Sequence, residues 1–250
     1  MRTYPTVAPT TPPRLRSAAV TESRSYRQPR FQAPPGATEL ILVRHGESQP
    51  AIDGEPFDLV DGHGDPALSP EGREQAARVC ARLGTERIDA IYVTTLRRTT
   101  ETAVALAEFL GLTPVVEPDL REVYLGDWEG GQFRKRVAEM DPIAVRMIEE
   151  ERWDVIPGAE PGDQFSARVR GAVDRIAATH PDERVAVFAH GGTIGEIFAQ
   201  AAGSRPWAFS AADNASISHL VVTAQSWVVR RFNDTSHLET TLTTGAEPPT

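Results

Sequence analysis

The 250-residue sequence contains a single cysteine, and it has no apolar run near the roughly 18 residues that a membrane-spanning helix needs. One cysteine, Cys80, cannot form an intramolecular disulfide or a cysteine-based zinc ribbon. The helical pattern around Cys80 predicts an inert thiol that packs inside the protein. This cysteine usage suits a reducing compartment, so we expect a cytoplasmic protein without a membrane partner.

Positive charge is also scarce. The 26 Lys and Arg residues are outnumbered by 35 Asp and Glu residues, which gives a formal net charge of -9. Nucleic acids require an extended basic surface, so we expect no nucleic-acid partner. The sequence lacks the Gly-x-x-x-x-Gly-Lys-Ser/Thr loop of many nucleotide hydrolases. Neither absence excludes a small phosphorylated substrate, because a phosphate monoester needs only a local cationic pocket.

The composition divides the chain into three parts. Residues 1–36 are rich in Pro, Thr, Ser and Arg and lack apolar periodicity, which predicts a disordered tail. This segment also lacks the apolar stretch of a secretory signal. Residues 37–238 carry the pattern of one catalytic domain. Residues 239–250 return to a composition rich in Thr, Gly and Pro, which predicts a second disordered tail.

Between these tails, short apolar runs alternate with amphipathic stretches. This alternation predicts an α/β fold with three layers, in which a mostly parallel sheet lies between helices. Ser69 and Pro70 suit the start of a helix, and Gly84 and Gly111 suit the ends of two helices. The expected strands are 39–43, 88–93, 114–116, 184–189, 217–222 and 227–232; the expected helices are 70–83, 96–110, 133–152 with a break near residue 142, 164–179 and 193–201.

Polar residues follow three of the expected strands. Arg44 and His45 end the first strand, Arg97 and Arg98 follow the second, and His190 follows the fourth. The site of such a fold lies beyond the carboxyl ends of its parallel strands, so these side chains should converge. Two histidines beside arginines at one sheet edge are more indicative of a functional site than a lone histidine would be.

Five ordered segments resemble the histidine phosphatase superfamily, which includes the cofactor-dependent phosphoglycerate mutases. They are LVRHGES at 42–48, LSPEGREQA at 68–76, YVTTLRRTTETA at 92–103, LREVYLGDWEG at 120–130 and FAHGG at 188–192. The resemblance implies a phosphoglycerate mutase-like α/β/α fold. It also implies a phosphomonoesterase that needs no metal or cofactor and hydrolyses a small phosphorylated substrate.

The resemblance and side-chain chemistry together assign roles to single residues. His45 would form a phosphohistidine, because a neutral imidazole can attack phosphorus without a separate base. Glu122 would act as general acid and then as general base. The expected catalytic set is His45, Glu122, His190, Arg44 and Arg98. The expected contacts to phosphate or substrate are Arg44, Arg98, His190, Ser48 and Gly191, the last at the start of a helix, where anions bind well.

Several neighbouring residues are rivals for these roles. Arg97 competes with Arg98, although a solvated position on the helix face is the expectation for Arg97. Asp127 is the first rival of Glu122. Three further carboxylates lie in the same stretch, namely Glu117, Asp119 and Glu129.

Two other groups of residues have a structural and a functional interpretation. Asp61, His63 and Asp65 resemble a metal cluster, but the glycines between them predict a turn without a metal. His63 could alternatively contact the substrate. Trp207 and Trp227 are expected to be packing residues.

A mutase is the main alternative function, because Arg134, Lys135 and Arg136 could bind further anionic groups of a phosphoglycerate. Against it, mutases and many phosphatases of the family have an asparagine six residues after the nucleophile, where this sequence has Ala51. Acidic residues at 149–151 also disfavour highly anionic substrates through repulsion.

A non-catalytic phosphate-binding module is the other alternative. Such a module should have lost His45, Glu122 or His190, and all three residues are present. No sequence rule identifies the substrate. Dimers are the commonest assemblies of soluble proteins, so a homodimer is the default expectation.

Overall fold

The computed structural model describes residues 25–238. Most of the predicted N-terminal tail, residues 1–24, and the whole of the predicted C-terminal tail, residues 239–250, lie outside the described residues. Residues 1–32 form a unit separate from the domain that begins at Ala33, and the described part of that unit has no helix or strand. None of the helices within residues 25–238 has the length and apolarity to cross a membrane.

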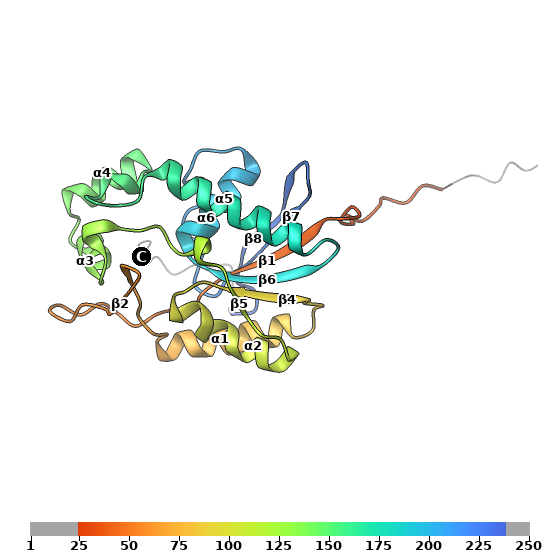
Figure 1. Cartoon of the computed structure of the whole chain (residues 1–250), viewed down its shortest axis with the longest axis horizontal. Coiled ribbons are helices and arrows are strands. Elements are labelled where there is room, and N and C mark those ends of the chain that lie inside the picture. The colour runs from red at the N-terminus through yellow and green to blue at the C-terminus, as the bar shows by residue number, and fades with distance from the viewer. Residues whose placement is uncertain (1–24, 239–250) are drawn as a thin grey trace, which may run out of the picture. The chain divides into compact units, whose positions relative to one another are not determined.

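Six strands form one sheet, in the spatial order β5 (Val115–Val116), β4 (Ala90–Val93), β6 (Arg184–Ala189), β1 (Thr38–Arg44), β7 (Ile217–Val222) and β8 (Trp227–Asp234) (Figure 1). The first four strands of this order are parallel to one another. The last two are antiparallel to their neighbours. The predicted mostly parallel sheet is therefore confirmed.

Four long helices cover the two faces of the sheet: α1 (Pro70–Leu83) and α2 (Arg97–Leu110) on one, α5 (Gly162–Thr179) and α6 (Gly191–Ala202) on the other (Figure 1). Successive side chains of a strand point to opposite faces. In β1, Leu40 and Leu42 accordingly pack in the core beneath α5 and α6. Ile41 and Val43 pack in a second core with α1 and α2. These two cores establish the predicted three-layer α/β/α fold.

Most helix ends fall where the sequence predicts them. The Ser69 hydroxyl caps α1 by accepting a hydrogen bond from the Gly72 N–H at 3.0 Å. Gly111 ends α2 in the left-handed region, with φ of 67°. Helix α6 begins two residues earlier than predicted, because His190 already takes the extended N-cap conformation.

The chain between Trp128 and the start of α5 forms a separate layer beyond the carboxyl ends of the parallel strands (Figure 1). Its helices are α3 (Gln132–Ala138) and α4 (Pro142–Glu150), which are separated at Pro142 as predicted. They pack a third small core around Trp128 and Met147. The sequence analysis did not predict the hairpin of β2 (Leu59–Val60) and β3 (His63–Gly64), nor the short 3-10 helices η1 (Pro118–Leu120), η2 (Gly126–Trp128) and η3 (Trp153–Val155).

The loop after β1 lies directly against α1. A Cβ atom on Gly72 would lie only 1.9 Å from the Glu47 carbonyl oxygen, and one on Gly46 would lie 2.5 Å from the Gly72 carbonyl oxygen. The Ser69 hydroxyl also donates to the Glu47 carboxylate at 2.6 Å. Because both close contacts involve backbone atoms, the first turn of α1 fixes the path of the chain that carries His45.

We predict that Gly72→Ala lowers the free energy of unfolding by about 2–3 kcal/mol, because the new methyl group must displace backbone. Gly171→Ala in α5 is the matched control, since only the flexible end of Arg175 lies near its Cβ position. This control should raise the free energy of unfolding by about 0.5–1 kcal/mol through helix propensity. Urea unfolding of both variants measures the difference. Equal effects would contradict the close contact.

Candidate active site

Two histidines lie side by side at the carboxyl edge of the sheet. His45 directly follows β1 and His190 directly follows β6, and their ring centroids are 5.3 Å apart. The His45 N–H donates to the Ala189 carbonyl at 3.0 Å, so the two strand ends are joined. Both side chains are buried, with 6% and 0% of their surfaces exposed. The convergence expected from the strand order is therefore present.

The ring of His45 is held in one tautomer. Its Nδ1 atom lies 2.7 Å from the Gly46 carbonyl oxygen, and a carbonyl can only accept, so Nδ1 carries the proton. The Nε2 atom is then unprotonated, and its lone pair accepts a hydrogen bond from the Nε–H of Arg98 at 3.3 Å. Burial, followed by the charges of Arg98 and Arg44, lowers the pKa of His45 well below its usual value. His45 is therefore a neutral imidazole with a reactive nitrogen.

Arg98 and Arg44 flank this nitrogen from α2 and the end of β1. Arg98 donates to the Gly64 carbonyl at 2.9 Å, and Arg44 donates to the Ala212 carbonyl at 2.6 Å. The Nε of Arg44 is buried and has no partner among residues 25–238. Burial lowers the pKa of Arg98 to about 10, so the guanidinium stays charged at neutral pH. Both arginines have N–H groups left for an anion.

Arg97 points away from this site. Its Nε pairs with Glu101 at 3.0 Å, and half of its side chain is exposed. Its backbone N–H donates to Asp65 at 2.8 Å. The structure thus places Arg98 at the site and Arg97 on the solvated face of α2.

His190 contributes a second polar group to the site. Its Nε2 lies 3.0 Å from the Thr94 hydroxyl, whereas its buried Nδ1 has no partner within the described chain. Burial and the charge of Arg98 lower the pKa of His190 well below its usual value. The Nδ1 atom of this neutral ring therefore has one hydrogen bond unformed, although His190 itself is fully buried and does not line the cavity described below.

Glu122 is bound by the N-terminus of α6. Its carboxylate accepts from the N–H groups of Gly192 at 3.0 Å and Thr193 at 3.1 Å. These amides follow Gly191, so part of the helix terminus that we expected to bind phosphate holds the carboxylate instead. Gly191 lines the cavity under Arg44, and its Cβ position lies 3.3 Å from the Arg44 Nε.

The segment that carries Glu122 is anchored from α5 by Arg168. This guanidinium donates to the carbonyl oxygens of Asp119, Arg121 and Glu122 at 2.7–2.9 Å. It also forms a partly buried ion pair with Glu160. Five N–H donors in a planar fork suit this set of acceptors. Arg168 therefore positions the loop beside the two histidines.

The rival carboxylates have other partners. Asp127 is exposed and does not line the cavity. Glu117 and Asp119 both pair with Arg175 on the surface. Glu129 lines the cavity but uses both of its oxygens on backbone N–H groups. The structure therefore brings Glu122, and none of these rivals, to the α6 terminus beside His190.

Ser48 and Arg134 form a contact that the sequence analysis missed. Arg134 on α3 donates to the Ser48 hydroxyl at 2.6 Å and to the Gln49 carbonyl at 2.7 Å. Arg134 lines the cavity, and its charge lowers the pKa values of His45, Arg44 and Arg98. Ser48 was expected to contact phosphate, but here it orients a third arginine. No local sequence signal distinguishes Arg134 from its neighbours Lys135 and Arg136.

The segment from Asp61 to Asp65 forms the predicted turn, within the β2–β3 hairpin. His63 donates to the Asp61 carbonyl at 3.2 Å and packs edge-on against Tyr124. The Asp61 carboxylate pairs with Arg121. Within residues 25–238, no group of three His, Cys, Asp or Glu side chains could hold a metal ion.

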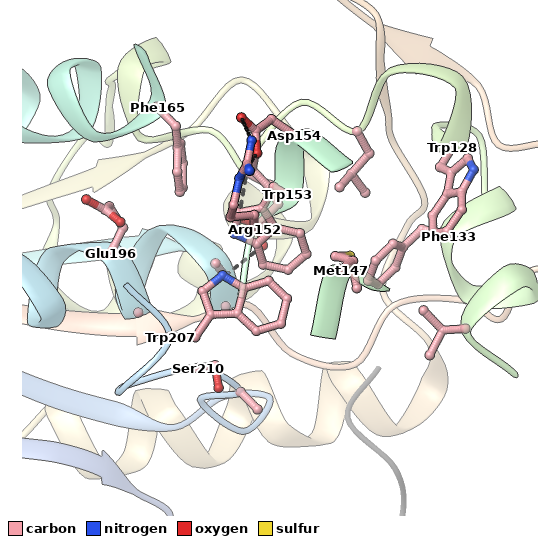
Figure 2. Close-up of a pocket in the computed structure, with 18 of the residues that line it drawn as sticks. Trp128, Phe133, Met147, Arg152, Trp153, Asp154, Phe165, Glu196, Trp207 and Ser210 are labelled. Carbon is pink, nitrogen blue, oxygen red and sulfur yellow. Dashed lines mark hydrogen bonds and ion pairs between the residues drawn. The ribbon is translucent and has the colours of Figure 1, made fainter. Parts of the chain in front are cut away.

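A cavity of about 820 Å³ extends from His45 into the layer of α3 and α4. Its inner end is lined by Arg44, Arg98 and Glu122. Its outer wall includes Trp153 and Trp207 (Figure 2). Trp207 packs against Trp153, as expected, and in addition it lines the cavity. The site combines a cationic end with an aromatic end.

A neutral histidine with an unprotonated nitrogen, three arginines and a nearby carboxylate are groups that suit phosphoryl transfer. The sequence model of the histidine phosphatase superfamily (branch 1) matches residues 40–235, and the chain belongs to this family. It is an enzyme of the hydrolase class, a histidine phosphatase. The resemblance of the five segments is thereby confirmed.

Two relatives and one solved structure are similar to this chain over most of its length. Phosphoglycerate mutase-like protein 4 of Arabidopsis thaliana is 33% identical over 207 residues, which cover 81% of this chain and 88% of that protein. A metal-independent phosphoserine phosphatase of the same plant is 34% identical over 210 residues, covering 80% and 83%. The crystal structure of phosphoglycerate mutase from Bacillus anthracis superposes with a TM-score of 0.69 at 21% identity, covering 81% of this chain and 96% of that one, which shows the shared fold.

We predict that His45 makes stability depend on pH. Its pKa is below the usual 6.5 in the folded state, so the unfolded chain binds more protons as the pH falls through 6.5. The contribution of His45 is fully present above pH 6.5 and is lost as the pH falls from 6.5 toward the folded pKa. Chemical unfolding between pH 5 and 7.5 should show a shallower pH dependence for His45→Gln than for the wild type. Parallel curves would contradict the prediction.

Proposed function

We propose that this protein is a metal-independent phosphomonoesterase that forms a phosphohistidine on His45 and uses Glu122 as general acid and base. The tautomer of His45 carries this proposal, because the Nδ1–H bond to Gly46 leaves the Nε2 lone pair facing the cationic end of the cavity. A relative that covers most of the chain is named as a metal-independent phosphatase, which supports the same route.

In the first step, the Nε2 lone pair of His45 attacks phosphorus and the bond from phosphorus to the leaving oxygen breaks. A proton from the Glu122 carboxyl group passes to that oxygen, so the alcohol leaves uncharged. Arg44, Arg98 and the free nitrogen of His190 would hold the phosphoryl oxygens. Charge that develops on these oxygens is then met by buried N–H donors.

In the second step, the Glu122 carboxylate takes a proton from water while the water oxygen attacks phosphorus. The N–P bond breaks, inorganic phosphate leaves and the His45 lone pair is restored. The N–H groups of Gly192 and Thr193 bind the carboxylate, which is the form that accepts this proton. The same residue therefore serves both steps.

The basic residues of α3 favour a phosphatase over a mutase. Lys135 pairs with Asp53 at 2.7 Å, and Arg136 pairs with Asp141 at 2.8 Å. Of these three neighbours only Arg134 lines the cavity. A mutase must retain a doubly anionic substrate while its phosphate moves. Two of the three basic residues that could bind such a substrate, Lys135 and Arg136, are instead paired with carboxylates of the protein.

We predict that the wild type releases phosphate from p-nitrophenyl phosphate in excess chelator, and that His45→Ala lowers kcat by at least about 10³-fold. Rapid acid-free quenching should trap a base-stable, acid-labile phosphoprotein in the wild type alone. Arg97→Ala is the control for Arg98→Ala: the first should keep the wild-type rate, whereas the second should lose at least about 10²-fold. Full activity in His45→Ala would refute the proposed nucleophile.

We also predict that Glu122→Gln affects substrates according to their leaving group. An alkyl phosphate needs a proton on its leaving oxygen, so its kcat/KM should fall by about 10²–10⁴-fold. The ester of p-nitrophenol should lose much less in the phosphoryl-transfer step, because its phenolate leaves readily without a proton. Single-turnover measurement of this step with both esters tests the role. An equal loss for both would assign Glu122 a purely structural role.

A further inference from the structure

We infer that the substrate has a bulky, apolar or aromatic leaving group that carries no second anionic group. This inference rests on the proposed phosphatase function and names the class of ester that the site takes. It depends on three features of the cavity: its size, the aromatic side chains of its outer wall and the charges at the end far from His45.

The cavity is larger than a small phosphorylated metabolite requires. Its volume of about 820 Å³ lies in the upper part of the range of about 300–1,000 Å³ found for pockets that bury most of a drug-sized ligand. A phosphoryl group held at His45 occupies only the inner end. The remaining space must be filled by the alcohol portion of the ester or by water.

The outer wall is built from aromatic and apolar side chains of five different segments. Trp153 of η3 and Trp207 of the chain after α6 lie together, with ring centroids 4.6 Å apart (Figure 2). Phe133 of α3 packs against Trp153 at 6.0 Å, and Phe165 of α5 and Met147 of α4 also line the space. Tryptophan faces exposed to a concave space favour a flat apolar ligand that stacks on them.

The charged groups at the outer end disfavour an anion. Arg152 lies beside the tryptophans in Figure 2, but it is bound by both oxygens of Asp154 at 2.9 and 3.0 Å. Asp163 and Glu196 line the same part of the cavity. A carboxylate or second phosphate placed there would meet a negative field and an arginine that is already paired. The cationic end at Arg44 and Arg98 matches one phosphoryl group.

A short polar leaving group would gain little from this wall. Serine, the alcohol of phosphoserine, is small and polar and offers almost no apolar surface to pack on the two tryptophans. A ring system would displace that water and bury apolar surface on both partners. Selectivity should therefore increase with the apolar size of the alcohol.

The test compares three alkyl phosphates whose alcohols differ little in reactivity: ethyl phosphate, O-phosphoserine and 2-(1-naphthyl)ethyl phosphate. We expect kcat/KM for the naphthyl ester to exceed that of the other two by at least about 100-fold, as hydrophobic pockets discriminate by about 10–200-fold per added group. A carboxylate added to the naphthalene ring should lower the kcat/KM of the naphthyl ester by at least about tenfold. Equal or faster hydrolysis of phosphoserine would overturn the inference.

Trp153→Ala and Trp207→Ala should each lower the ratio of naphthyl to ethyl ester by about tenfold, mainly by raising KM for the naphthyl ester. Phe109→Ala is the control, because Phe109 is an exposed aromatic residue of α2 that does not line the cavity. It should leave the ratio unchanged. An unchanged ratio in both tryptophan variants would also overturn the inference.

Binding separates this inference from the proposed function. The His45→Ala variant cannot form a phosphohistidine, but its aromatic wall is intact. Quenching of tryptophan fluorescence should show that 2-(1-naphthyl)ethylphosphonate binds this variant at least about tenfold more tightly than ethylphosphonate. Tighter naphthyl binding without hydrolysis of any ester by the wild type would sink the phosphatase proposal alone. Hydrolysis with equal binding of both phosphonates would sink only the inference about the leaving group.

Discussion

The hydrogen bond from His45 Nδ1 to the Gly46 carbonyl determines which nitrogen faces the cavity, and the other groups of the site are arranged around the lone pair that remains on Nε2. Gly46 is itself fixed, because its N–H donates to Thr102 at 3.0 Å and its Cα lies against Gly72. A rotation of the peptide group that follows Gly46 would turn its carbonyl oxygen away from Nδ1 and free the imidazole ring. The close contact between two glycine-containing segments thus serves the chemistry as well as the packing of α1.

The site also gathers three arginines in a largely buried place, which is costly unless each has partners. Arg44, Arg98 and Arg134 each donate to a backbone carbonyl, and the charge of Glu122 favours the protonated forms of the first two. Burial, together with the charges of Arg98 and Arg44, lowers the pKa values of His45 and His190 and keeps both rings neutral. The positive charge of the arginines would attract a phosphate dianion, and the same charge disfavours a proton on His45.

The sequence by itself determined the layers and the residues of the phosphate end. Apolar runs and helix caps are local signals, and they placed β1, β6, α1 and α2 to within a few residues. His45 and His190 were found because parallel strands end at a common edge, where their side chains must meet. The order of five motifs was enough to identify the family. The family resemblance favoured Arg98 over Arg97. In the structure, Arg98 lies beside His45 and Arg97 lies on the solvated face of α2.

Only the tertiary structure decided what surrounds this end. The amides of α6 hold Glu122, Ser48 orients Arg134, and Trp207 joins Trp153 in the cavity wall. Each of these pairs joins residues far apart in the chain, and no periodicity or cap encodes such a contact. These contacts form only when the layer of α3 and α4 packs over the sheet edge, and the shape of that packing is not encoded in any local sequence pattern. The sequence therefore located the histidines and arginines that meet at the sheet edge, and the packing decided the form of the cavity beside them.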